Sequence, residues 1–158
     1  MDIKEKVIES QRKIIDDLAE CEVHVGMLYD KYAAIFPAMK TEWSGLATAE
    51  KTHADMLKSM HRILDKKSLF FNLGKFGKEA TSQLLDFINE AIKSADKPGF
   101  TMQDAVNAAL KIETSIIDAH FYDIVTSDAP EFKIIADRLT ADTKKHIKAI
   151  NEYLSRNK

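Results

Sequence analysis

Residues 49–57 read AEKTHADML and place a glutamate and a histidine three positions apart, at Glu50 and His53. The stretch is otherwise typical of a helix, and Leu57 and Met60 continue the same side at helical spacing. Side chains at positions i and i+3 project from adjacent turns of one helix face. The sequence therefore predicts a helix that places Glu50 and His53, two side chains able to bind a metal, on its apolar side. Whether they bind one depends on which residues the other helices place at the same depth.

The composition is that of a soluble globular protein. Apolar residues make up 45% of the 158 residues and charged residues 30%, a balance that a disordered chain would not have. The length suits a single domain over residues 1–158. The formal net charge is −2 with both signs interspersed, which argues against a nucleic-acid partner because such proteins usually carry a basic patch.

The chain shows no membrane or export signal. No apolar run approaches the roughly 20 residues that cross a bilayer, so we expect no membrane association. The stretch MDIKEKVIESQRK, residues 1–13, lacks the apolar core of a signal peptide. Cys21 is the only cysteine, which excludes a disulfide framework or a cysteine-based zinc site within one chain. We therefore expect a cytoplasmic protein.

Proline and loop signals divide the first half of the chain. We expect a first long helix over residues 3–36, which ends where Pro37 follows. A second helix should run from Pro37 or Thr41 to about Leu64. The following stretch KKSLFFNLGKFG, residues 66–77, has two glycines and no clear period, and it therefore reads as a loop with apolar anchors.

Capping signals define two helices in the second half. Thr101 and Asp104 have the spacing of a capping box, which predicts a helix from there to about Thr126. Pro130 suits the first turn of a last helix, which should reach about Tyr153. Two further long helices are therefore expected.

The order of these elements predicts an all-α four-helix bundle. Residues 78–95 resume helical spacing and predict a shorter helix between the second and third long helices. The long connection that contains it would be a crossover, which lets the second and third long helices run parallel. No strand-like alternation is found, so we expect no sheet.

Each long helix interrupts its apolar stripe near the middle with an ionisable residue. These residues are Glu22 in the first helix, Glu50 and His53 in the second, Glu113 in the third, and Asp142 and His146 in the fourth. Buried carboxylates cost several kcal/mol each and would repel one another unless protons or cations neutralised them. Lysine and arginine are almost absent from the stripes, and a divalent metal pair would accept carboxylates and imidazoles together. The pattern predicts a metal site, and the alternative is a structural polar layer.

Four segments extend this interpretation to a family. They are ECEVHVGMLYDKYAAIFP (20–37), WSGLATAEKTHADML (43–57), ALKIETSIIDAHFYDIV (109–125) and LTADTKKHIKAI (139–150). With them the chain resembles the ferritin-like superfamily and, within it, the rubrerythrin-like diiron proteins, over nearly its whole length. The resemblance implies a ferritin-like bundle, two iron ions (zinc or another divalent metal being the alternative) and a homodimer.

The resemblance also implies a ligand set. The family takes one glutamate from each of two helices and a Glu-x-x-His pair from each of the other two. Carried over position by position, the ligands are Glu22, Glu50, His53, Glu113 and His146.

Two positions depart from the family. Thr143 stands where the family has the glutamate of the second pair, and Asp142 is the nearest substitute. Asp142 could replace that ligand, water could fill its place, or only one metal could bind well. Ile116 stands where rubrerythrins carry an additional glutamate, and His120 could be an alternative ligand, an outer contact of the site or a core histidine.

The resemblance implies an oxidoreductase that reacts with O₂ or peroxide. The paired cysteine motifs of a rubredoxin module are missing, so an external electron donor would be needed. Two alternatives stay open because of the departures at Thr143 and Ile116: a metal-binding or iron-handling protein without turnover, and a helical scaffold with a degenerate metal site.

Overall fold

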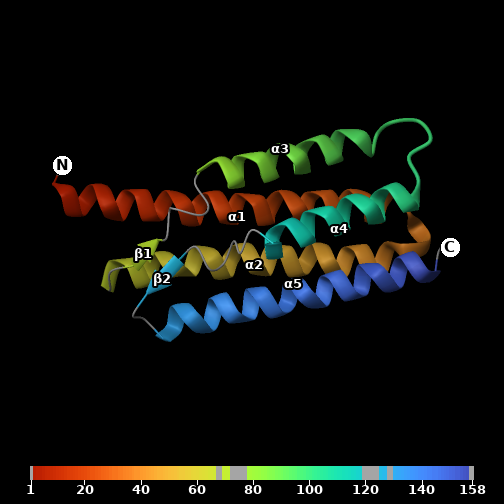
Figure 1. Ribbon diagram of the computed structural model, residues 1–158. Coiled ribbons are helices and arrows are strands. Elements are labelled where there is room, and N and C mark those ends of the chain that lie inside the picture. Colours follow the sequence, from red (N-terminus) through yellow and green to blue (C-terminus); the bar gives the residue numbers. More distant parts are fainter. Residues whose placement is uncertain (1, 67–68, 72–77, 119–124, 128–129, 157–158) are drawn as a thin grey trace.

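The computed structural model describes residues 2–66, 69–71, 78–118, 125–127 and 130–156, and this part of the chain is almost entirely helical (Figure 1). Its elements in chain order are α1 (Ile3–Ile35), the 3₁₀ helix η1 (Pro37–Met39), α2 (Lys40–Lys66), β1 (Leu69–Phe71), α3 (Lys78–Ser94), α4 (Met102–Asp118), β2 (Val125–Ser127) and α5 (Pro130–Arg156). The prediction of an all-α fold is confirmed at this level.

The helices pack lengthwise against one another. α1 contacts both α2 and α3, α4 contacts α5, and α2 also contacts α5. In Figure 1, α2 and α4 run in one direction, whereas α1, α3 and α5 run in the other. In the described part of the chain, none of the helices has the length and apolar character needed to span a membrane.

Local sequence signals explain where the helices begin. The Asp2 side chain accepts a hydrogen bond from the Glu5 backbone N–H at 2.8 Å, and Glu5 returns one at 3.3 Å, which closes a capping box at the start of α1. The capping box predicted at Thr101 and Asp104 is present, with reciprocal bonds of 2.9 and 3.1 Å. Pro130 is the first residue of α5, as predicted from its fixed φ and missing N–H.

Two predictions about regular structure are wrong. The chain does contain strands, because β1 pairs with β2 in an antiparallel ladder that aligns Phe70 with Thr126. The helix expected to reach Thr126 ends at Asp118, since Thr126 lies in β2. Each strand has only three residues, too few to show alternation, and the partners are far apart in the sequence. Aromatic and β-branched residues in both strands favour the extended conformation.

The interior is formed by one contiguous apolar cluster. Its largest fully buried side chains are Trp43, Tyr29, Tyr32, Ile15, Leu28, Leu57, Met60, Ile88, Ile112 and Leu139. These residues come from α1, α2, α3, α4 and α5, so the cluster joins all five helices. Burial of this apolar surface provides the main stabilisation of the fold.

Replacement of Leu139 by alanine should destabilise the metal-free protein by about 2–5 kcal/mol, because the side chain is fully buried and its loss leaves a cavity. Ile134 lies on the same helix but is 68% exposed, so its replacement by alanine should change the unfolding free energy by no more than about 0.5 kcal/mol. Urea denaturation measures both values. Equal losses in the two variants would contradict the assignment of the buried face of α5.

Candidate metal centre

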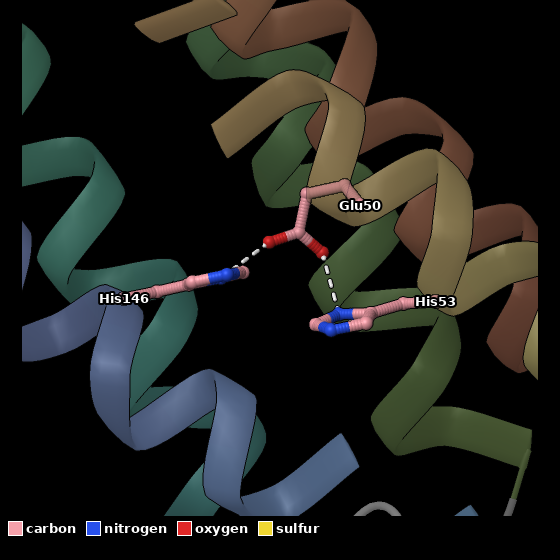
Figure 2. Close-up of side chains that lie close together, drawn as sticks. All are labelled: Glu50, His53 and His146. Atoms are coloured by element: carbon pink, nitrogen blue, oxygen red, sulfur yellow. Dashed lines mark ion pairs between the residues drawn. The ribbon is translucent and has the colours of Figure 1, made fainter. Parts of the chain in front are cut away.

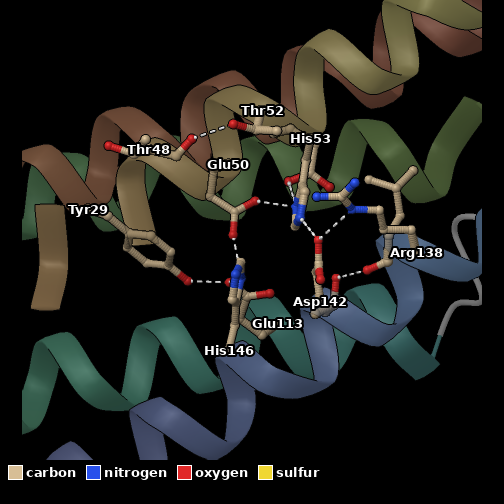
Figure 3. Close-up of polar contacts among 12 residues, drawn as sticks. Tyr29, Thr48, Glu50, Thr52, His53, Glu113, Arg138, Asp142 and His146 are labelled. Atoms are coloured by element: carbon tan, nitrogen blue, oxygen red, sulfur yellow. Dashed lines mark hydrogen bonds and ion pairs between the residues drawn. The ribbon is translucent and has the colours of Figure 1, made fainter. Parts of the chain in front are cut away.

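Four helices place ionisable side chains at one level of the interior (Figure 3). Glu50 and His53 come from α2, Glu113 comes from α4 and His146 comes from α5. Glu22 on α1 is also buried, and its Oε2 lies 4.0 Å from His53 Nδ1. None of these five side chains belongs to a residue more than 8% exposed. The sequence prediction that they share a common depth is therefore confirmed.

Glu50, His53 and His146 form the centre of this group, and Figure 2 shows how they face one another. Glu50 Oε1 lies 2.8 Å from His146 Nδ1, and Glu50 Oε2 lies 3.4 Å from His53 Nδ1. The two imidazole rings stack with their centroids 5.3 Å apart. One ligand atom from each residue lies within 4.8 Å of the others, so the three could hold a metal ion.

The chemistry of these atoms fits a metal ion. Glu50 Oε1, His53 Nδ1 and His146 Nδ1 are buried, yet none makes a hydrogen bond with any described residue. Glu50 Oε1 and His146 Nδ1 are close enough for one, so their orientation is what prevents it. Buried polar atoms without hydrogen bonds are costly and rare, and in the metal-free protein these atoms are compensated only by ion-pair contacts with one another. Imidazole with carboxylate also suits iron, zinc and similar transition metals, so the same atoms could serve as ligands of a common cation.

Glu113 is held at the edge of the triad by a tyrosine. Its Oε1 accepts a 2.7 Å hydrogen bond from the Tyr29 hydroxyl and lies 3.5 Å from His146 Nδ1. Both Tyr29 and Glu113 are at most 1% exposed. The sequence places Tyr29 on the apolar stripe of the first helix, seven residues after Glu22. The partner of its hydroxyl depends on how α1 meets α4, which spacing along one helix does not determine.

Asp142 lies beside the outer ring nitrogen of His53. Its Oδ2 lies 3.2 Å from His53 Nε2, the ring nitrogen that faces away from Glu50. A carboxylate is an acceptor, so Nε2 carries the proton and Nδ1 keeps its lone pair for a metal. Arg138 Nε lies 3.8 Å from the same oxygen. Asp142 therefore orients His53 from outside in this structure, and its role as a replacement metal ligand stays a prediction.

The departures from the family pattern are visible in the structure. The Thr143 side chain is buried, and its hydroxyl donates to the Leu139 carbonyl at 2.9 Å, so it is bound to its own helix. Ile116 is a buried core residue on α4. His120 lies outside the described residues, and its role as a ligand stays a prediction.

The pKa values of the Glu50 and Glu113 carboxyl groups shift in opposite directions. Burial alone would raise the pKa of Glu50, but hydrogen bonding with Glu22 and contacts with the two imidazoles outweigh it and lower the pKa. Burial raises the pKa of Glu113 to about 7, and the nearby charge of Glu50 adds to the effect. A proton on Glu113 and a charge on Glu50 thus reduce the repulsion between them in the metal-free protein.

The histidines respond to the same carboxylates. Burial alone would lower the pKa of His146, but contacts with Glu113 and Glu50 raise it to about 10. The pKa of His53 is also raised, because contacts with Glu50 and Asp142 outweigh its burial. Without a metal, protons balance the negative charge of the cluster, and a metal ion would have to displace them.

Comparison with protein-family models, with curated proteins and with solved structures gives no match for this chain. The candidate centre is therefore supported by its geometry: Glu50, His53 and His146 are brought together, with Glu22 and Glu113 beside them.

Asp142→Asn should weaken metal binding by about 10–100-fold. An amide can donate as well as accept, so it no longer holds the proton of His53 on Nε2 and leaves Nδ1 less available to a metal. Asp137 is exposed on the same helix and pairs with Lys133, so Asp137→Asn provides a matched control that should bind metal normally. Competition with a chromophoric chelator measures both affinities. An unchanged affinity in Asp142→Asn would contradict the orienting role.

His146 should make the metal-free protein less stable as the pH rises. Its pKa is higher in the folded state, about 10 against 6.5 for a free histidine, so its stabilisation is complete below pH 6.5 and is lost as the pH approaches 10. Urea denaturation at several pH values in this window should show a smaller decline for His146→Gln than for the unchanged chain. Parallel curves for the two proteins would contradict the shift.

Proposed function

We propose that this chain is a metal-binding protein of the ferritin-like, rubrerythrin-like type. In this proposal α1, α2, α4 and α5 form the four-helix bundle, and α3 lies in the long crossover. The observation that carries it is the convergence of Glu50, His53 and His146 in the buried interior, with two further glutamates beside them. Every one of the four proposed bundle helices contributes to the group.

The negative charge of the group favours a divalent cation. Three ionised glutamates, Glu22, Glu50 and Glu113, and two neutral histidines would carry a charge of about −3, because neutral imidazole adds none. One divalent ion would leave a net charge of about −1 and two would leave about +1, so either number meets the charge balance about equally. In this proposal two ions bind, as in the family that the sequence resembles. Glu50 and His53 would hold one ion and His146 the other, and Glu113 and Glu22 would supply further carboxylate ligands.

The proposed activity is that of an oxidoreductase toward O₂ or peroxide. A bound iron pair would supply the electrons for that chemistry. The chain itself would position the ligands, through the Tyr29 hydrogen bond to Glu113 and the Asp142 contact with His53. The buried side chains around the group would limit access of water.

One observation favours a second candidate, metal binding or iron handling without turnover. Thr143 donates its hydroxyl to the backbone of its own helix and offers no carboxylate. The ligand set is therefore one carboxylate smaller than in the family that the sequence resembles, which would hold the second ion less firmly.

Metal analysis and a visible spectrum of the aerobically purified protein test these proposals. A diiron oxidoreductase should contain close to two iron ions per chain and show an absorption band that bleaches on reduction and returns with peroxide. Tightly bound iron or zinc with no such cycle would favour the second candidate. A metal-free protein whose melting temperature does not change when Fe²⁺ is added would contradict both, since a ligand of the folded state must stabilise it.

Glu50→Ala and Glu113→Ala should each abolish metal loading. Each should also destabilise the metal-free fold, because both carboxyl groups contact the buried His146 imidazole and removal of one member of a buried pair leaves the other uncompensated. Asp55 on α2 is an exposed carboxylate, so Asp55→Ala should load metal as the unchanged chain does. Elemental analysis and thermal denaturation check these outcomes. Normal metal content in Glu50→Ala would refute the assignment.

A further inference from the structure

Aromatic side chains gather beside the candidate metal centre. Tyr29, Tyr32 and Trp43 are all fully buried. The ring centroid of Trp43 lies 5.4 Å from that of Tyr29 and 5.0 Å from that of Tyr32. These ring contacts stabilise the core. Packing alone does not explain why Tyr29, at one end of the cluster, also donates a hydrogen bond to Glu113, a proposed metal ligand.

Through Tyr153 the aromatic contacts continue from the centre toward the outer part of α5. At the inner end, the Tyr29 hydroxyl donates to Glu113 at 2.7 Å (Figure 3). At the outer end, the Tyr153 ring meets Trp43 edge to face, with centroids 5.9 Å apart. Tyr153 is 7% exposed, and the guanidinium of exposed Arg156 lies 5.7 Å from its ring centroid. Three aromatic rings in contact therefore span the distance from Glu113 to the outer part of α5.

The hydrogen bonds of these residues differ in a way that matters for oxidation. A tyrosine that loses an electron also loses its phenolic proton, so it needs an acceptor nearby. Tyr29 has one in Glu113, whereas the Tyr32 hydroxyl makes no hydrogen bond with any described residue. Trp43 Nε1 also makes none, but an indole can lose an electron while it keeps its proton. Tyr29 and Trp43 thus have complementary properties.

We propose that Tyr29, Trp43 and Tyr153 conduct oxidising equivalents from the candidate centre to the surface. This inference rests on the proposed function, in which peroxide produces a one-electron oxidant at the centre. Such a path would release that oxidant when no substrate is present, before it damages the buried ligands.

The steps balance in electrons and protons. Tyr29 gives one electron to the oxidant, its O–H bond breaks, and the proton moves to Glu113 Oε1. Trp43 then returns an electron to Tyr29, which takes its proton back, and Trp43 becomes a radical cation. Tyr153 next gives an electron to Trp43 and a proton to water. A thiol in solution restores the Tyr153 phenol by supplying one electron and one proton, and the thiol is oxidised.

A flash experiment on the full chain in its metal-free form tests the path, at a pH above the Glu113 pKa of about 7 so that this carboxylate can accept the Tyr29 proton. Trp43 is the only tryptophan, so an ultraviolet flash that ejects an indole electron produces a radical whose optical signal belongs to that residue. In the unchanged protein this radical should decay as a tyrosyl radical forms. Replacement of both Tyr29 and Tyr153 by phenylalanine should slow the decay by about tenfold or more, which corresponds to a higher barrier. Tyr32→Phe, which alters the neighbour without a proton acceptor, should decay as the unchanged protein does.

The direction of transfer is tested with iron-loaded protein and peroxide. Mass spectrometry should find an oxidised product at Tyr153, reduced by about tenfold in Trp43→Phe if Trp43 lies on the path. Equal Tyr153 oxidation in Trp43→Phe, or a Trp43 radical that decays equally fast without Tyr29 and Tyr153, would overturn the inference. A chain that binds no iron but shows the flash behaviour would refute the proposed function alone.

Discussion

Three glutamates and two histidines lie buried together in the interior, and the balance of charge among them constrains the side chains around them. Burial penalises each ionised group by several kcal/mol in an apolar environment. In the metal-free state the balance is met by protons, as the raised pKa values of Glu113 and His146 indicate. A divalent cation would meet the same need more directly, because it interacts with every member of the group at once.

The surrounding helices hold these charged side chains in fixed positions. α2 supplies both Glu50 and His53 because residues three apart face one way, and α5 supplies His146 opposite them. Outside these, Tyr29 fixes Glu113, and Asp142 fixes His53. Such outer contacts matter because they orient the ligands, and the orientation of the ligands affects the affinity for a metal. The apolar core on either side keeps water out, so the electrostatic interactions are strong and mutually dependent.

Much of this arrangement could be predicted from the sequence. The buried residues Glu22, Glu50, Glu113 and His146 interrupt apolar stripes at helical spacing, a signal that depends only on the period of the helix. The capping box at Thr101 and Asp104 was equally readable, because capping is local. Helix ends agree within one to three residues for α1, α2 and α5, the usual margin for frayed termini.

Other features could not be predicted, because they depend on contacts between distant segments. The ladder of β1 and β2 joins two three-residue stretches, and no local sequence pattern indicates that they pair. The helix α4 ends earlier than its capping and spacing suggested. Asp142 shares a helix face with His146, which suggested a common metal ion. The relative placement of α2 and α5 instead brings Asp142 to the far nitrogen of His53. Helix spacing gives the face of a side chain but not the atom that it meets.

Anomalous X-ray diffraction from crystals grown with Fe²⁺ tests the central claim most directly. We expect an iron peak about 2.0–2.3 Å from a Glu50 oxygen and from Nδ1 of His53 or His146, a distance range typical of first-row divalent ions with nitrogen and oxygen ligands. Iron found only at exposed carboxylates, with Glu50, His53 and His146 in their metal-free arrangement, would contradict the claim that this buried group exists to bind a cation.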